Sequence, residues 1–189
     1  MVRSIMVTGH RPGKLGGYTV NPIASRIRRE LHAIMAKTRH RFGSCVGITG
    51  MAQGTDQWFA EVCRDLSIPY IAYIPFPGQE RLWPSDAQHH YRQLVADASE
   101  VHIGPSANTQ SAVIAALHRR NSDMVIACHA AIAVWDGSSG GTADAVRKLT
   151  DIGRPLLRLD PREPFDPVAL DPWLDQLVGF VPTSRSHLP

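Results

Sequence analysis

Three short apolar segments, each followed by a polar loop that contains glycine, constrain the fold of this 189-residue chain most strongly. The segments and their loops are residues 5–7 before 8–18, residues 45–48 before 50–56, and residues 131–135 before 136–142. A helical pattern follows each loop. Strands that alternate with helices predict a parallel sheet with right-handed crossovers. We therefore expect a single α/β domain, a mostly parallel sheet flanked by helices, with the three loops at the edge where the strands end.

Apolar periodicity and start and stop signals place the remaining elements. Strands are expected at residues 2–7, 45–49, 70–74, 101–103, 131–135 and 155–159, and helices at residues 21–41, 55–66, 85–98, 107–127, 142–151 and 172–178. Asn21 and Ser85 are predicted N-caps, and Thr55 or Asp56 can cap the helix after the second loop. We expect one domain over residues 1–160 and a proline-rich tail over residues 161–189 that packs on the domain and frays at its end.

The composition excludes several classes of protein. The net charge is +3 and no run of like charges occurs, which does not favour nucleic acid as a partner. Three cysteines without CxxC spacing predict buried thiols in a reducing cytoplasm, and neither a disulfide framework nor a zinc site. No signal peptide or apolar run of membrane-spanning length is present, so we expect a cytoplasmic protein without a membrane partner.

The three loops together predict a site for a phosphorylated ligand. Glycines let a backbone approach a ligand, and the first amides of a helix carry no intrahelical partner. Two helix N-termini and Arg11 would converge at this edge of the sheet. Arg11 can make a charge-assisted contact with phosphate. A nucleotide is the simplest such ligand. Arg11 could instead pair with a local carboxylate, and a glycine turn between strand and helix is needed in any α/β protein.

Acidic and aromatic residues near the loops are candidates for other parts of the ligand. Asp136 follows a strand, where an Asp binds ribose, acts as a base, or caps the turn with Gly137. Glu80 is the most plausible catalytic carboxylate outside the glycine loops. Trp83 can stack on a base, or pack on its own loop. Nine histidines show no metal-ligand spacing, and no GxSxG elbow follows a strand.

Several motifs, in order along residues 2–160, resemble the YpsA-like branch of the SLOG superfamily. They are TGHRP at 8–12, LGGY at 15–18, GMAQGTD at 50–56, PF at 75–76, QE at 79–80, WP at 83–84, RN at 120–121, WDG at 135–137 and GGT at 140–142. The resemblance implies a Rossmann-like fold and a pocket for nucleotides or nucleotide-derived molecules. Relatives include cytokinin-activating phosphoribohydrolases, nucleotide-sensing domains of bacterial and phage conflict systems, and the single-stranded-DNA-binding fold of DNA-processing protein A. The resemblance is also compatible with a homodimer, since relatives often pair through helices.

One departure from the phosphoribohydrolases bears on catalysis. Their PGGxGTxxE motif carries a catalytic glutamate, whereas Ala145 falls at that place here. Asp144 is adjacent, but one residue turns a helical side chain by about 100°. Cleavage of an N-glycosidic bond needs a carboxylate, which Glu80, Asp56 or Asp136 would have to supply.

Three hypotheses follow from these patterns. The leading one is a cytoplasmic protein that binds a nucleotide or ADP-ribose-like ligand, as a sensor or accessory protein, with no cofactor and no metal. The second is a nucleotide N-glycosidase or phosphoribohydrolase with Glu80 or Asp56 as the catalytic carboxylate. The third is single-stranded DNA binding, supported by the basic residues of helix 21–41. The predicted ligand-binding residues are Thr8, Gly9, His10, Arg11, Gly50, Met51, Gly54, Thr55, Asp56, Trp83, Arg120, Asn121, Asp136, Gly137, Gly140, Gly141 and Thr142.

Overall fold

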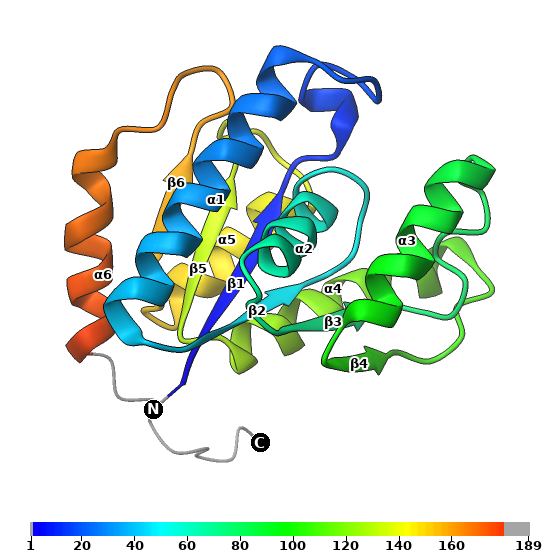
Figure 1. Cartoon of the computed structure of the whole chain (residues 1–189). Helices are drawn as coiled ribbons and strands as arrows, with labels where there is room; N and C mark the ends of the chain where they lie inside the picture. Colours follow the sequence, from blue (N-terminus) through cyan, green and yellow to red (C-terminus); the bar gives the residue numbers. More distant parts are fainter. Residues whose placement is uncertain (1, 180–189) are drawn as a thin grey trace.

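A computed structural model describes residues 2–179 as an α/β domain built on a six-stranded sheet, with strand order β4-β3-β2-β1-β5-β6 and every neighbouring pair parallel (Figure 1). The strands are β1 (Arg3–Gly9), β2 (Cys45–Thr49), β3 (Tyr70–Ile74), β4 (Glu100–Ile103), β5 (Ala130–Val134) and β6 (Leu156–Leu159). The α-helices are α1 (Pro22–Phe42), α2 (Thr55–Asp65), α3 (Ser85–Asp97), α4 (Gln110–Ala127), α5 (Gly141–Asp151) and α6 (Leu170–Gly179). Two 3₁₀ turns, η1 (Pro12–Lys14) and η2 (Pro167–Ala169), complete the elements of the described residues. The predicted fold class is confirmed: the fold is Rossmann-like.

Helices cover both faces of the sheet and create one apolar cluster on each (Figure 1). The larger cluster joins the sheet to α1, α2, α3 and α6, and the smaller one joins it to α4 and α5. Such two-sided coverage explains why the central strands are apolar on both faces, as in β5, where every residue is buried. Cys45, Cys63 and Cys128 are buried free thiols, as predicted. None of the helices in residues 2–179 is long and apolar enough to span a bilayer.

The segment after β6 contributes to the same core. Leu170, Trp173, Leu174 and Leu177 of α6 are buried in the larger cluster, and α6 lies beside α1. Ion pairs join the two helices at Lys37–Asp171 and Arg41–Asp175. The predicted boundary at residue 160 stays a prediction, and the predicted fraying of the end falls on residues 180–189, outside the described part of the chain.

Most predicted elements are confirmed, with differences at their ends. Asn21 caps α1 as predicted, its Oδ1 accepting from the Ala24 amide at 2.9 Å. The Ser85 prediction is wrong, because Pro84 is the N-cap of α3 and Ser85 is its first helical residue. β1 runs on to Gly9 because Thr8 and Gly9 pair with Ala133 and Val134 of β5. Those two residues therefore belong to the sheet edge and not to a loop.

The topology itself creates a crevice at this edge. β1 lies between β2 and β5, and its neighbours are reached by crossovers on opposite faces, through α1 on one side and α4 on the other. Where the direction of crossovers reverses, the loops at the carboxyl ends of the two strands diverge and leave room for a ligand. The loops after β1 and β5 are two of the three glycine loops that the sequence singled out.

Candidate functional site

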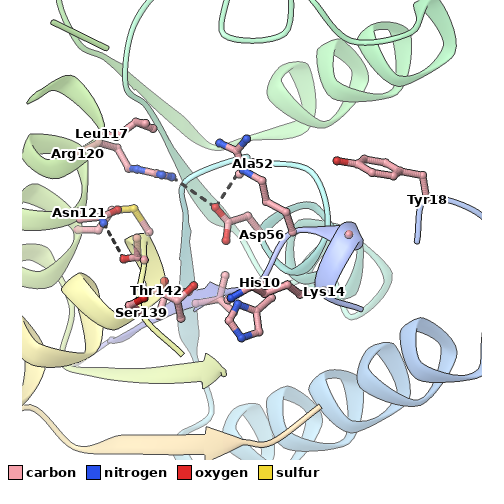
Figure 2. A pocket seen from close by; sticks show the side chains of 18 residues that line it. His10, Lys14, Tyr18, Ala52, Asp56, Leu117, Arg120, Asn121, Ser139 and Thr142 are labelled. Atoms are coloured by element: carbon pink, nitrogen blue, oxygen red, sulfur yellow. Dashed lines mark hydrogen bonds and ion pairs between the residues drawn. The ribbon is translucent and has the colours of Figure 1, made fainter. Parts of the chain in front are cut away.

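A pocket of about 420 Å³ opens at the carboxyl ends of β1 and β5 (Figure 2). Its wall is formed by the end of β1, η1, the start of α2, the middle of α4 and the start of α5. Ten of the predicted site residues line it: Thr8, Gly9, His10, Arg11, Asp56, Arg120, Asn121, Gly140, Gly141 and Thr142. Residues from five elements far apart in the sequence thus meet in one place. Its volume lies within the range of small-molecule sites, about 300–1,000 Å³.

The start of α5 presents an uncapped helix N-terminus to this pocket. Gly140 is the N-cap, with φ 137°, and no side chain bonds the first amides of the helix. A Cβ atom at Gly140 or Gly141 would meet no atom within 4 Å, so the space beside these two residues is open. Asn121 of α4 donates from Nδ2 to the Gly141 carbonyl at 3.2 Å, which holds the turn in place. Unpaired amides and the helix dipole make this end a suitable place for an anion.

A buried ion pair joins α2 to α4 in the pocket wall. Asp56 is only 7% exposed, and its Oδ2 lies 3.4 Å from Arg120 Nη1 and accepts from the Ala52 amide at 3.2 Å (Figure 2). Burial raises the pKa of Asp56, an effect that Arg120 only partly offsets, and burial also lowers the pKa of Arg120. Arg120 Nε is buried without a hydrogen-bond partner among the described residues. The pair is therefore held at a desolvation cost, which is common at functional sites.

Gly50 provides the room in which Arg120 reaches Asp56. A Cβ atom on Gly50 would lie 1.3 Å from Arg120 Nη1 and 2.9 Å from Asp56 Oδ2. Gly50 thus lies behind the pocket wall and supports the ion pair.

Replacing Gly50 by alanine is expected to displace Arg120 and to lower the free energy of unfolding by about 1–3 kcal/mol, the usual cost of overpacking a buried site. Urea denaturation measures the loss. Gly13→Ala is the matched control, since its Cβ would meet no atom within 4 Å. Equal stability of both variants would show that Arg120 has another place to go.

His10 and Asp136 form a second polar contact beside the pocket. His10 Nε2 lies 2.7 Å from Asp136 Oδ1, and the same oxygen accepts from the Ser138 amide at 2.9 Å and its hydroxyl at 2.6 Å. The Ser138 bonds and the His10 contact lower the pKa of Asp136. Asp136 does not line the pocket. Of the roles considered for it, the one present in the structure is the contact within the turn, with Ser138. Its contact with ribose stays a prediction.

The other glycine-loop residues shape the turn between β2 and α2 from behind. Met51 and Gly54 have φ of 59° and 93°, and the Thr55 hydroxyl donates to the His10 carbonyl at 3.1 Å. The expected capping by Thr55 or Asp56 is wrong, because Gly54 is the N-cap of α2 and no side chain bonds the first amides. Met51, Gly54 and Thr55, like Gly50 and Gly137, are absent from the lining of the pocket.

Glu80 and Trp83 lie with α3, away from the pocket lining. Glu80 Oε1 is 3.6 Å from Arg92 Nε, and the Trp83 ring meets Tyr91 edge-on with centroids 5.4 Å apart. Trp83 therefore packs on Tyr91, and packing was the alternative to stacking on a base. Asp144 also faces elsewhere: it pairs with His118, Arg147 and Lys148, and Ala145 is fully buried. Among the residues that line the pocket, Asp56 is the one carboxylate.

Eight lining residues were missing from the predicted site: Val7, Gly13, Lys14, Tyr18, Ala52, Leu117, Met124 and Ser139. Leu117 and Met124 lie on the same stripe of α4 as Arg120 and Asn121, at spacings of three, four and seven residues, so helical periodicity could have found them. Lys14 Nζ donates to Ser138 Oγ at 2.6 Å and so connects the loop after β1 to the loop after β5. Tyr18 follows two glycines in the first loop, which was the signal available for it.

A family model described as the YspA SLOG family (YpsA) matches residues 5–151, which include every lining residue of the pocket. The chain belongs to this family. It is 28% identical over 163 residues to the uncharacterized SPbeta prophage-derived protein YoqJ of Bacillus subtilis (strain 168), covering 77% of this chain and 94% of YoqJ. The chain therefore has a phage-related homologue.

Solved structures at low identity share the fold. DNA processing protein A from Streptococcus pneumoniae superimposes with a TM-score of 0.59 at 13% identity, over 94% of this chain and 56% of the other. The DNA processing protein A of Helicobacter pylori, described for its single-stranded DNA binding mode, gives a TM-score of 0.57 at 14% identity, over 84% and 65%. The chain thus spans little more than half of the pneumococcal protein. These likenesses support the Rossmann-like fold alone.

Proposed function

We propose that this protein binds a phosphorylated, nucleotide-like ligand in the pocket at the ends of β1 and β5, as a binding or sensing protein. The observation that carries the proposal is the open, uncapped start of α5 in a pocket that also contains the exposed cations Arg11 and Lys14. Membership of the SLOG family also supports a nucleotide-derived ligand.

The charged residues that line the pocket indicate how the ligand is oriented in it. The first turn of α2 itself contributes the Asp56 carboxylate to the pocket, and this carboxylate repels a second anion. The start of α5 has no acidic side chain in the lining. We therefore propose that phosphate lies at Gly140, Gly141 and Thr142, and that the sugar and base extend toward Arg120, Asp56 and the mouth of the pocket. An ADP-ribose-like ligand is one member of this class.

One observation keeps an enzymatic function as the second candidate. Asp56 is a buried carboxylate with a raised pKa inside the pocket, a combination typical of acid–base catalysts. Its pairing with Arg120, and the fully buried Ala145 at the glutamate position of the phosphoribohydrolases, favour binding without turnover. Asp56→Asn separates the two: release of free base from a nucleotide by the wild type, lost in this variant, would support a nucleotide N-glycosidase or phosphoribohydrolase.

The basic face of α1 does not favour DNA as the ligand. Arg26 pairs with Glu30, Arg28 with Glu61, Lys37 with Asp171 and Arg41 with Asp175. Cations already neutralised by carboxylates release few counterions from a nucleic acid, so they contribute little to its binding.

Replacing Arg11 by alanine tests the proposed site. We expect affinity for phosphate-bearing probes such as AMP or ADP-ribose to fall about 10- to 100-fold, the worth of one charge-assisted hydrogen bond. Isothermal titration measures it, and mass spectrometry of the small molecules released from denatured protein identifies a co-purified ligand. Arg29→Ala is the control, because Arg29 is exposed on α1 and outside this pocket. Equal effects of both substitutions, or no binding by the wild type, would reject the proposal.

A further inference from the structure

Tyr18 is an exposed aromatic residue at the mouth of the pocket. It is 70% exposed, and in Figure 2 its ring extends toward the pocket from the side opposite Leu117 and Asn121. Within residues 2–179 its ring makes none of the stacking or cation–π contacts that occur elsewhere in the protein. No other Tyr, Phe or Trp lines this pocket. An aromatic ring left exposed at a pocket is available to a ligand.

The loop that carries Tyr18 is fixed at both ends. Leu15 is fully buried, and its amide and that of Gly17 both donate to the Pro12 carbonyl at 2.8 Å. At the other end Asn21 is the N-cap of α1. Between them Gly16 and Gly17 have φ of 87° and 101°, a conformation that side-chain-bearing residues rarely adopt. The turn therefore directs Tyr18 outward from two fixed points, where it stays within reach of the pocket.

A second hollow, of about 390 Å³, adjoins the pocket at Tyr18, which lines both. The two hollows are bordered by successive residues of the same two segments: Arg11, Gly13, Lys14 and Ala52 line the pocket, whereas Pro12, Gln53 and Gly54 line the second hollow. Trp58, with the Arg28 guanidinium 5.2 Å from its ring centroid, lies in the second hollow, and no carboxylate lines it. There is thus room on both sides of Tyr18 for a flat, uncharged group.

We propose that Tyr18 recognises the base of the ligand by stacking on it at the border between the pocket and the second hollow. This inference rests on the proposed function, since it places the phosphate at the start of α5 and the base at the opposite, open end of the site. The base then meets a ring whose face is already exposed, so binding requires no unpacking of the core. Stacking tolerates any base, which makes Tyr18 a detector of a planar ring without selecting one base.

The test compares probes with and without a base. The base-bearing probes are AMP and ADP-ribose, and ribose 5-phosphate retains sugar and phosphate alone. In isothermal titrations Tyr18→Ala is expected to weaken binding of the base-bearing probes about 5- to 100-fold, the worth of one base–aromatic stack, and to leave ribose 5-phosphate unchanged. Tyr18→Phe is expected to bind all probes like the wild type. Leu82→Ala is the control, since Leu82 is a 97% exposed apolar residue that lines neither the pocket nor the second hollow.

Each other outcome has a distinct meaning. An equal loss for ribose 5-phosphate and the base-bearing probes in Tyr18→Ala overturns the stacking role and leaves the phosphate site standing. Unchanged affinity for every probe in Tyr18→Ala also overturns it. A wild type that binds none of the probes rejects the proposed function and this inference together. Because Tyr18 is exposed, the melting temperature of Tyr18→Ala is expected to match that of the wild type, so a loss of binding would not reflect unfolding.

Discussion

Replacing Arg120 by leucine is expected to lower the free energy of unfolding by about 3–5 kcal/mol at pH 7, the usual cost of leaving a buried charge unpaired. Asp56 would keep the bond from the Ala52 amide but lose its cation, and with 7% exposure it could not recover full hydration. Urea denaturation measures the loss. Arg119→Leu is the matched control, because Arg119 is the exposed neighbour on the same helix, where a substitution usually changes stability by less than about 0.5 kcal/mol.

The deficit of Arg120→Leu is expected to shrink as the pH is lowered from 7 toward 4. The pKa of Asp56 in the folded protein is already above its ordinary value of 3.8, and loss of Arg120 raises it further. In the window between 3.8 and the folded-state pKa, the folded chain binds the proton more tightly than the unfolded chain does. The contribution of Asp56 to stability is therefore most favourable at low pH and is lost as the pH rises through the folded-state pKa.

A double variant shows whether the penalty comes from the unpaired charge. Asp56→Leu combined with Arg120→Leu removes both charges, and we expect it to regain most of the stability lost in Arg120→Leu. A deficit in Arg120→Leu that does not change with pH and persists in the double variant would mean that the loss comes from packing, and that Asp56 is hydrated in the pocket.

The parts of the fold that local sequence determines were predictable. β2 and β3 are each an apolar run bounded by turn residues, and the bounds of both were predicted to the residue. The end of β1 was not, because Thr8 and Gly9 enter the sheet by pairing with β5, more than 120 residues away. The N-cap of α3 was also predicted wrongly, because the neighbouring residue decides it. Serine is a common cap, but Pro84 already has the extended backbone that a cap position needs.

The parts of the site that lie within one sequence motif were predictable. The parts that depend on a contact between two motifs were not. Gly140, Gly141 and Thr142 form the start of one helix, so their place in the pocket follows from the sequence alone. Asp56 and Arg120 were each predicted as ligand-binding residues, but their pairing across 64 residues, and the space that Gly50 leaves for it, arise only in the folded chain.

The aromatic residue at the site illustrates the limit of reasoning from residue type. Trp83 and Glu80 lie in an irregular segment, where an aromatic ring and a carboxylate suggest a binding loop. Packing decides otherwise, because Trp83 lies edge-on against Tyr91 of α3 and is partly buried against the larger apolar cluster. Tyr18 lies in an equally irregular loop but is 70% exposed at the pocket. Which of two aromatic residues is free to meet a ligand depends on the neighbours that the fold supplies.

Replacing Gly141 by proline is expected to lower affinity for phosphate-bearing probes about 10- to 100-fold while leaving the fold intact. Gly141 is the first residue of α5, where proline is well tolerated because its amide has no partner inside the helix. Gly140 before it has φ 137° and ψ −164°, so it is outside the helical region that proline disfavours in the residue before it. The substitution thus removes one N–H from the proposed phosphate site and changes little else in the protein.

Gly141→Ala separates the missing amide from the added carbon atoms. Its Cβ meets no atom within 4 Å and its N–H remains, so it is expected to bind AMP, ADP-ribose and ribose 5-phosphate like the wild type. All three probes carry phosphate, and Gly141→Pro is therefore expected to weaken each of them to the same extent, unlike Tyr18→Ala. Titrations of the two Gly141 variants, with melting temperatures measured beside them, check this. Wild-type affinity in Gly141→Pro would mean that the amides of α5 do not hold the phosphate, and would move the phosphate toward Arg11 and Lys14 alone.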